Sequence, residues 1–193
     1  MKFIFASSSP RRKKLLSNFN LDIEFISHRF NENSIDKNIE PYSYCEIISR
    51  EKANSLVDIY PNQTILSADT IVLSPNNKIF EKPKSEKDAY RMLRELSGEK
   101  HQVLTGVSII QKQAQINFSF IETTQVEFND LTDEEIYYYI KHFEPYDKSG
   151  SYGIQGFSSL FVKSINGRYF NVVGLPLSRL FYFLKKFNLL QFS

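Results

Sequence analysis

Short apolar runs and longer amphipathic stretches follow one another along the first third of the chain. The apolar run Phe3–Ala6 predicts a strand, and Ser9 followed by Pro10 is typical of an N-cap and the first position of a helix. Apolar side chains recur at roughly helical intervals over Pro41–Ile59, which predicts a second helix. The apolar run Thr64–Ala68 predicts a strand with an acidic residue at its end.

The middle of the chain shows a hairpin pattern and a well-delimited helix. Ile71–Leu73 and Lys78–Phe80 flank two asparagines, a residue type that tolerates the positive φ angles of a tight turn. Ser85 and Asp88 have the spacing of a helix capping box, and Gly98 is placed to end that helix. The apolar positions between them form a stripe at helical spacing: Ala89, Met92, Leu93 and Leu96.

Two long strands and another helix are expected next. The strands cover His101–Ile110 and Gln115–Phe128 and are joined by a short turn. Thr132 and Glu135 repeat the capping-box spacing and predict a helix that ends at about Phe143, before a proline.

The last quarter of the chain predicts a loop, a second hairpin and a closing helix. Lys148–Gly156 contains too many glycines for a strand. Leu160–Ile165 and Tyr169–Val173 are predicted to pair as strands across an Asn-Gly dipeptide. Pro176 begins a helix whose inward-facing side chains are expected to be Leu177, Leu180, Phe181 and Leu184.

The order of these elements limits the fold class. Strands and helices are mixed without strict alternation, which favours an α/β architecture around a mixed, twisted sheet over a doubly wound parallel one. A chain of 193 residues can form one substantial core or two lobes, but not several independent domains.

Composition excludes several classes of protein. Lys and Arg number 24 and Asp and Glu 22, a balance that argues against a nucleic-acid-binding module. The single cysteine, Cys45, excludes an internal disulfide and a multi-cysteine zinc site, and it suits a reducing cytosol. No apolar run approaches the roughly 20 residues that cross a bilayer. We therefore expect a soluble protein of the cytoplasm that binds neither nucleic acid nor membrane.

The first predicted helix opens with an unusual charge pattern. Its first turn carries consecutive cations: Arg11, Arg12, Lys13 and Lys14. A helix N-terminus already carries partial positive charge, so cations are disfavoured there unless an anion binds. A strand, a turn containing Ser7 and Ser9, and a helix together direct backbone N–H groups toward a phosphate. A solvated basic helix start with an ordinary serine cap explains the same residues about equally well.

Other residues suit the chemistry of a phosphorylated substrate, although each has a simpler interpretation. Asp69 and Thr70 follow a predicted strand, where α/β folds place catalytic or metal-binding groups, yet such residues are more often turn formers. Lys82 lies one hairpin away, so one sheet edge can present a carboxylate and an ammonium. Glu32 lies in a polar loop that can supply a metal ligand, and its simpler interpretation is an exposed loop acid. Lys52 lies on the second helix, where it is either a phosphate partner or an ordinary surface charge.

The glycine-dense segment ahead of residue 157 supplies one more candidate. Gln155 carries a donor and an acceptor, which suit the edge of a nucleobase; a plain connecting loop is the alternative. The histidines, His28, His101 and His142, lack the spacing of zinc ligands and receive no role.

Taken together, these segments resemble the Maf family of nucleoside triphosphate pyrophosphatases over essentially the whole chain. Each motif is individually weak, but their order and spacing are specific. The residues that carry the resemblance are Ala6–Arg12, Arg50–Ala53, Ala68–Val72, Glu81–Pro83, Leu96–Gly98, Thr105–Val107, Gly153–Gly156 and Val173–Leu177.

The resemblance implies a single Maf-like domain over residues 1–193, with a curved mixed sheet and flanking helices that form two lobes around a cleft, as in Maf and ITPase-like proteins. It implies a Mg²⁺ or Mn²⁺ requirement, with Glu32 and Asp69 as metal ligands, and frequent homodimers. Asp69 matches the family's proposed general base. The residues that match phosphate-binding positions are Ser7, Ser9, Arg12, Lys52 and Lys82.

The positions associated with substrate choice in this family are Arg11, Thr70 and Gln155. They match the branch that hydrolyses dTTP and UTP to the monophosphate and pyrophosphate, a house-cleaning reaction, rather than the branch resembling 7-methylguanosine triphosphate pyrophosphatases. Asp69 would deprotonate a water for attack at the α-phosphorus, with a metal ion lowering the pKa of that water. Two alternatives stay open: a nucleotide-binding regulator of septum formation without turnover, and a pyrophosphatase for another base, such as inosine, xanthosine or 7-methylguanosine triphosphate.

Overall fold

The computed structural model describes residues 2–36 and 38–190, which form two compact units. The first unit comprises the described residues of Met1–Asp69, Thr105–Glu122 and Gly174–Ser193. The second comprises Thr70–Leu104 and Thr123–Val173. Two units agree with the two lobes that the resemblance implies, while the cleft stays a prediction.

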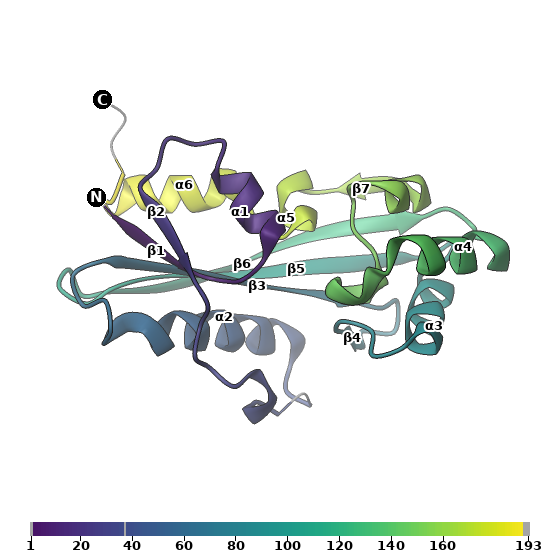
Figure 1. The fold of residues 1–193 in the computed structure, drawn as a ribbon, viewed down its shortest axis with the longest axis horizontal. Helices are drawn as coiled ribbons and strands as arrows, with labels where there is room; N and C mark the ends of the chain where they lie inside the picture. The colour runs from purple at the N-terminus through teal and green to yellow at the C-terminus, as the bar shows by residue number, and fades with distance from the viewer. Residues whose placement is uncertain (1, 37, 191–193) are drawn as a thin grey trace. The chain divides into compact units, whose positions relative to one another are not determined.

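The described residues contain a mixed sheet, which confirms the predicted α/β class (Figure 1). Its strand order is β2-β1-β3-β5-β6-β7, and β4 pairs with β3. β1 is parallel to β2 and β3, whereas β4 and β7 are antiparallel to their neighbours. The strands are β1 (Phe3–Ala6), β2 (Ile23–Ile26), β3 (Thr64–Leu73), β4 (Ile79–Phe80), β5 (Lys100–Gln111), β6 (Ile116–Phe128) and β7 (Val162–Asn166).

The α-helices begin and end close to the predicted positions, except Tyr169–Val173, which was predicted as a strand. Within the described residues, no helix is long and apolar enough to cross a membrane. The helices are α1 (Pro10–Leu16), α2 (Pro41–Val57), α3 (Glu86–Leu96), α4 (Asp133–Phe143), α5 (Tyr169–Val173) and α6 (Leu177–Lys186).

The predicted helix caps explain why these helices begin where they do. The Ser9 side chain accepts a hydrogen bond from the backbone N–H of Arg12, so one donor at the start of α1 is satisfied. Thr132 and Glu135 form a reciprocal capping box at the start of α4. These local interactions depend on neighbouring residues alone, which is why the sequence pattern predicts them.

In the first unit, α2 lies on one side of the strands and α1 and α6 lie on the other (Figure 1). A cluster of buried side chains fills the space between α2 and the strands: Ile4, Ala6, Ala53, Leu56, Ile65 and Ile110. Burying apolar area in this way is the main favourable contribution to the stability of the unit.

Small residues let α2 approach the strands closely. A Cβ placed on Gly106 of β5 would lie 2.5 Å from the carbonyl oxygen of Cys45 on α2, so glycine is required there. Ser49 of α2 and Ser108 of β5 are joined by a hydroxyl hydrogen bond of 2.9 Å, and both are fully buried. The Ser67 hydroxyl of β3 donates to the carbonyl of Ser49.

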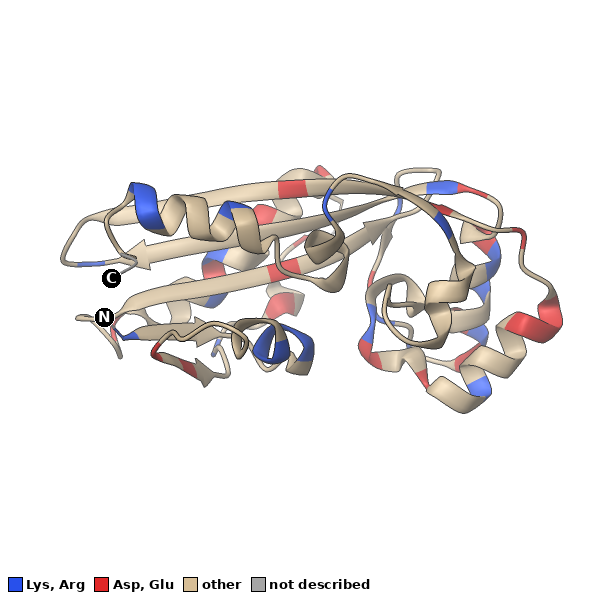
Figure 2. Cartoon of the chain, turned by 90° about the horizontal axis from the view of Figure 1, so that it is seen from above, with Lys and Arg blue, Asp and Glu red and all other residues tan. Residues whose placement is uncertain are grey.

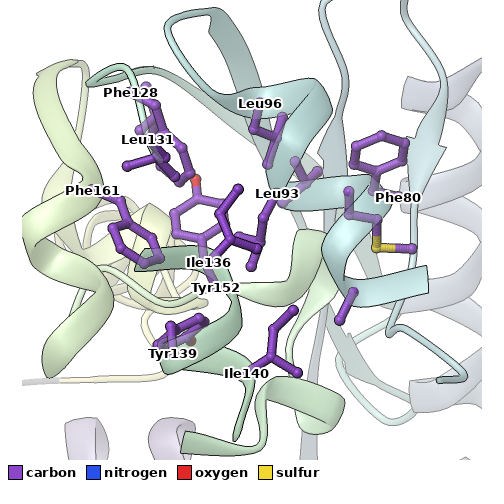
Figure 3. Packing of buried hydrophobic residues seen from close by; sticks show 14 of the residues in the cluster. Phe80, Leu93, Leu96, Phe128, Leu131, Ile136, Tyr139, Ile140, Tyr152 and Phe161 are labelled. Carbon is purple, nitrogen blue, oxygen red and sulfur yellow. The ribbon is translucent and has the colours of Figure 1, made fainter. Parts of the chain in front are cut away.

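In the second unit, the core lies between α3, α4 and the strands (Figure 3). The predicted stripe of α3 is buried, as expected for an amphipathic helix. The stripe packs against large side chains of α4 and the segments that follow it. These side chains are almost completely buried: Ile136, Tyr139, Ile140, Tyr152 and Phe161.

Strand β3 is longer than predicted, which changes the setting of Asp69. The sequence pattern predicted two separate strands, 64–68 and 71–73, with Asp69 and Thr70 between them as turn formers. In the structure β3 continues through both residues. Its first part pairs with β1 and its last part with β4, so pairing on either side of the polar residues keeps the backbone extended.

The predicted hairpin across residues 166 and 167 is wrong, because Tyr169–Val173 forms helix α5. β7 pairs with β6 instead. The Thr124 hydroxyl accepts a hydrogen bond from the backbone N–H of Arg168, and buried Asn171 donates to the carbonyl of Val103. These contacts stabilise a turn into a helix. A short apolar run does not distinguish a strand from a buried helix, so the sequence alone could not settle this segment.

We predict that Gly106→Ala lowers the free energy of unfolding by about 2 kcal/mol, because the added methyl group must displace α2 or β5 from a closely packed contact. Gly153→Ala is the matched control. Its Cβ would lie 3.4 Å from the Lys148 side chain, an ordinary contact distance, so we expect a change within about 0.5 kcal/mol. Urea denaturation of both variants checks the difference; equal midpoints would contradict the proposed close contact.

Candidate functional site

The turn between β1 and α1 brings the predicted serines together with Arg12. The Ser7 hydroxyl accepts hydrogen bonds from the Ser9 backbone N–H at 3.2 Å and from Arg12 Nη1 at 3.3 Å. Arg12 Nε donates to the carbonyl of Gly174 at 2.8 Å. The guanidinium is therefore fixed to the backbone ahead of α6, within the first unit.

Arg12 differs from the other cations of α1 because its side chain is buried. The basic stretch of α1 is visible as a dense blue segment in Figure 2. Burial lowers the pKa of the Arg12 guanidinium, and the charge of Asp69 opposes this shift. Because arginine has an intrinsically very high pKa, Arg12 keeps its charge and supplies a buried positive centre.

A second group of predicted residues meets around Lys52, which projects from α2. Its ammonium lies 2.6 Å from Asp69 Oδ1 and 3.0 Å from Glu32 Oε2. The exposed fraction of the side chain is 8% for Lys52, 14% for Asp69 and 45% for Glu32. A buried ammonium needs such partners, since an unpaired buried charge is strongly unfavourable.

His28, to which the sequence assigned no role, contacts this group. Its Nε2 lies 3.3 Å from Glu32 Oε1, four residues further along the chain. The hydrogen bond from His28, followed by the nearby charge of Lys52, lowers the pKa of Glu32 to about 2. Glu32 is therefore ionised at neutral pH. The spacing of four residues was visible in the sequence, but an irregular loop gave no reason to expect the contact.

Cys45 contacts the backbone of Asp69, a member of the same group. Its Sγ accepts a hydrogen bond from the Gly106 backbone N–H at 3.0 Å and donates to the carbonyl of Asp69 at 3.6 Å. Burial raises the pKa of this thiol, so it stays protonated and serves as a small hydrogen-bonding group. Cys45 is fully buried, and nothing in the sequence pattern indicated its contact with the Asp69 backbone.

Glu32 and Asp69 were predicted as metal ligands, and their chemistry fits a divalent cation. Both present carboxylate oxygens to one positive group, the Lys52 ammonium. Mg²⁺ is commonly held by one or two carboxylates, with water and substrate phosphates completing the shell. Among the described residues there is no group of three or more His, Cys, Asp or Glu that could hold a metal ion.

The remaining predicted residues lie in the second unit, except Arg11, which lies half-buried on α1. Thr70 is part of β3, and its carbonyl accepts a hydrogen bond from the Ser149 hydroxyl at 2.9 Å. Lys82 and Gln155 have exposed side chains. A backbone hydrogen bond joins the two segments that carry Lys82 and Gln155: the N–H of Gly150 donates to the carbonyl of Glu81.

The chain is similar to known proteins over nearly its full length. Residues 2–187 match the family model described as Maf-like protein. A relative from Geobacillus sp. (strain WCH70), named dTTP/UTP pyrophosphatase, is 48% identical over 92% of this chain and 94% of its own length. A relative of the same name from Ruminiclostridium cellulolyticum is 44% identical over 96% of this chain and 95% of its own.

A solved structure, the Ham1 protein of Staphylococcus aureus, has 13% sequence identity and a TM-score of 0.47, covering 67% of this chain and 73% of that one.

We predict that Arg12→Lys lowers the free energy of unfolding by about 2 kcal/mol, because lysine cannot donate to Ser7 and the Gly174 carbonyl with the same geometry and leaves a buried acceptor unsatisfied. Arg91→Lys is the matched control, since Arg91 pairs with Asp88 on an exposed part of α3 and such pairs contribute little. Urea denaturation compares the two; an equally small effect for both would show that Arg12 is not a structural link.

Proposed function

The chain belongs to the family of Maf-like proteins, and on this basis we propose that it is a nucleoside triphosphate pyrophosphatase that hydrolyses dTTP and UTP. The products would be the nucleoside monophosphate and pyrophosphate. The observation that carries the proposal is the group formed by Lys52, Asp69 and Glu32. It combines a carboxylate suited to activate water with positive charge suited to phosphates.

The negative charge of a triphosphate repels an incoming nucleophile, so positive groups must offset it. Lys52 and Arg12 supply buried positive charge in the first unit, and Lys82 supplies an exposed ammonium in the second. The turn containing Ser7 and Ser9 lies at the start of α1, where backbone N–H groups favour a phosphate.

Asp69 is proposed as the general base. Its carboxylate would accept a proton from a water molecule while the water oxygen forms a bond to the α-phosphorus. The bond between that phosphorus and the oxygen bridging to the β-phosphate would break, and pyrophosphate would leave. The Asp69 backbone is fixed by the Cys45 thiol and its side chain by Lys52, which supports a defined position for the carboxylate.

We further propose that Glu32 and Asp69 hold a Mg²⁺ or Mn²⁺ ion when substrate binds. A bound divalent ion would neutralise phosphate charge and lower the pKa of a coordinated water. The low pKa of Glu32 supports this assignment, because a metal ligand must be deprotonated at working pH.

Base selection is proposed to depend on Gln155, with contributions from Arg11 and Thr70. The Gln155 amide presents a donor and an acceptor together, which can pair with the O4 and N3–H of uracil or thymine. Its side chain is exposed on a glycine-containing turn, a position from which it can meet a ligand.

We predict that Asp69→Asn removes most of the activity, by about a hundredfold or more, because the amide cannot accept the proton of the attacking water. The fold should persist, since Lys52 keeps Glu32 as a partner. The measurement is pyrophosphate release from dTTP and UTP with Mg²⁺ present, alongside a denaturation curve.

Asp58→Asn is the matched control, because Asp58 also pairs with a lysine, Lys112, but at an exposed surface of the same unit. It should keep wild-type turnover. Unchanged turnover by Asp69→Asn would contradict the assigned role. Release of orthophosphate and diphosphate by the wild-type protein would indicate cleavage at the terminal phosphate instead, and preference for inosine or xanthosine triphosphate would overturn the assigned base.

We predict that Gln155→Glu reduces kcat/KM for dTTP and UTP by about tenfold or more, because a carboxylate lacks the donor that an O4 oxygen requires. Metal affinity should change far less, which titration with Mn²⁺ can measure. Gln113→Glu, at an exposed site near Asn62, is the control for the added charge. Equal processing of both nucleotides by Gln155→Glu and the wild type would exclude this residue from base recognition.

A further inference from the structure

A network of hydrogen bonds in the second unit holds the segment that carries Gln155. We call residues 149–158 the anchored loop. Four successive residues at its start contact four different parts of the unit. Ser149 donates to the carbonyl of Thr70, the Gly150 N–H donates to the carbonyl of Glu81, the Ser151 hydroxyl contacts Met92 Sδ at 3.2 Å, and Tyr152 pairs with His101.

The contact between Tyr152 and His101 is deeply buried. The Tyr152 hydroxyl lies 2.6 Å from His101 Nε2, and the two side chains are 5% and 2% exposed. Their rings meet edge to face at 5.4 Å, and Phe128 packs against both (Figure 3 shows Tyr152 and Phe128). Tyr152 belongs to the buried apolar cluster, and both side chains are almost fully buried, so removal of one partner leaves the other poorly hydrated.

Burial also keeps this pair uncharged. It lowers the pKa of His101 to about 4 and raises the pKa of Tyr152 above its ordinary value. The histidine therefore stays neutral and the tyrosine stays protonated at neutral pH. A neutral buried hydrogen bond is directional and fixes the position of the tyrosine ring.

The turn that presents Gln155 begins at the residue after Tyr152. The Ser158 hydroxyl accepts a hydrogen bond from the Gly153 N–H at 3.2 Å and donates to the Gly153 carbonyl at 2.6 Å. Gly153 and Ser158 thus close a short turn, with Gln155 exposed within it. Gly156 has a φ of +79°, a conformation that glycine adopts without strain. One end of this closed turn is attached directly to the buried tyrosine.

We propose that Tyr152 and His101 are positioning residues for base recognition. They fix the start of the turn, and through it the direction in which the Gln155 amide meets a nucleobase. This inference rests on the proposed role of Gln155. A preordered recognition group loses less conformational entropy on binding, so removal of the buried hydrogen bond should weaken selection among bases rather than phosphate binding.

The test is Tyr152→Phe, which removes one hydroxyl and keeps the ring. We expect the KM for dTTP to rise about fivefold, kcat to change less than about twofold, and the ratio of kcat/KM for dTTP over dCTP to fall about fivefold. Competitive inhibition by inorganic tripolyphosphate should not change. His101→Leu should reproduce these effects, and His101→Gln, whose amide can still bond to the tyrosine hydroxyl, should restore part of the selectivity.

Tyr90→Phe is the matched control in the same unit. It also removes a tyrosine hydroxyl that is hydrogen-bonded, at 2.9 Å to Asp133, a residue of α4 outside the anchored loop. It should leave both the selectivity ratio and KM at wild-type values. A loss of turnover that is equal for every nucleotide in Tyr152→Phe would indicate a general structural role and overturn the proposal.

Amide hydrogen exchange separates failure of this inference from failure of the proposed function. In the unliganded protein, residues 153–158 should exchange faster in Tyr152→Phe than in Tyr90→Phe. This holds whichever nucleotide the enzyme accepts. If the wild type hydrolyses neither dTTP nor UTP, the proposed function fails, but the exchange rates of residues 153–158 still test the positioning role. Equal exchange rates in the two variants would overturn the positioning role of Tyr152.

Discussion

The close approach of α2 to strands β3 and β5 determines where the charged groups of the first unit can meet. Gly106 leaves room for the α2 backbone, and buried hydroxyl and thiol groups satisfy the polar atoms along the contact. Lys52 projects from this helix, so its ammonium reaches Asp69 only while the helix stays at this distance. Larger side chains at the contact would separate the two charges. The packing of small residues is thus the condition for the ion pair.

The ion pair in turn explains features that look unfavourable in isolation. Asp69 and Thr70 interrupt an apolar strand, and Lys52 is almost fully buried on a helix. Either charge alone would destabilise the unit, because transfer of an ion out of water costs several kcal/mol. Together, and with Glu32, they compensate each other. A bound phosphate would compensate the Lys52 ammonium in place of the carboxylates. A bound metal ion would compensate Asp69 and Glu32 in place of the ammonium.

The sequence predicted elements that depend on local interactions and failed where distant partners decide. Helices α3 and α4 were predicted closely because caps and apolar stripes involve neighbouring residues. Residues 169–173 were predicted as a strand because the contacts that favour a helix come from β5 and β6. From the residues alone, Glu32, Lys52 and Asp69 were separate candidates; the resemblance grouped Glu32 with Asp69, and the meeting of both with Lys52 depends on packing. His28 and Cys45 were missed for the same reason, since their contacts lie across elements.

The residues proposed for phosphates and those proposed for the base use different kinds of interaction, and the difference follows from what each set is proposed to bind. Coulomb attraction falls off slowly and depends little on direction, so charged side chains such as Lys52 suit phosphates. The edge of a base is uncharged, and its recognition requires donors and acceptors in defined directions. A neutral, buried anchor such as the Tyr152–His101 pair supplies direction without adding charge. With these proposed roles, rigid neutral contacts for the base and clustered charges for the phosphates would give one chain two separately adjustable sources of affinity and selectivity.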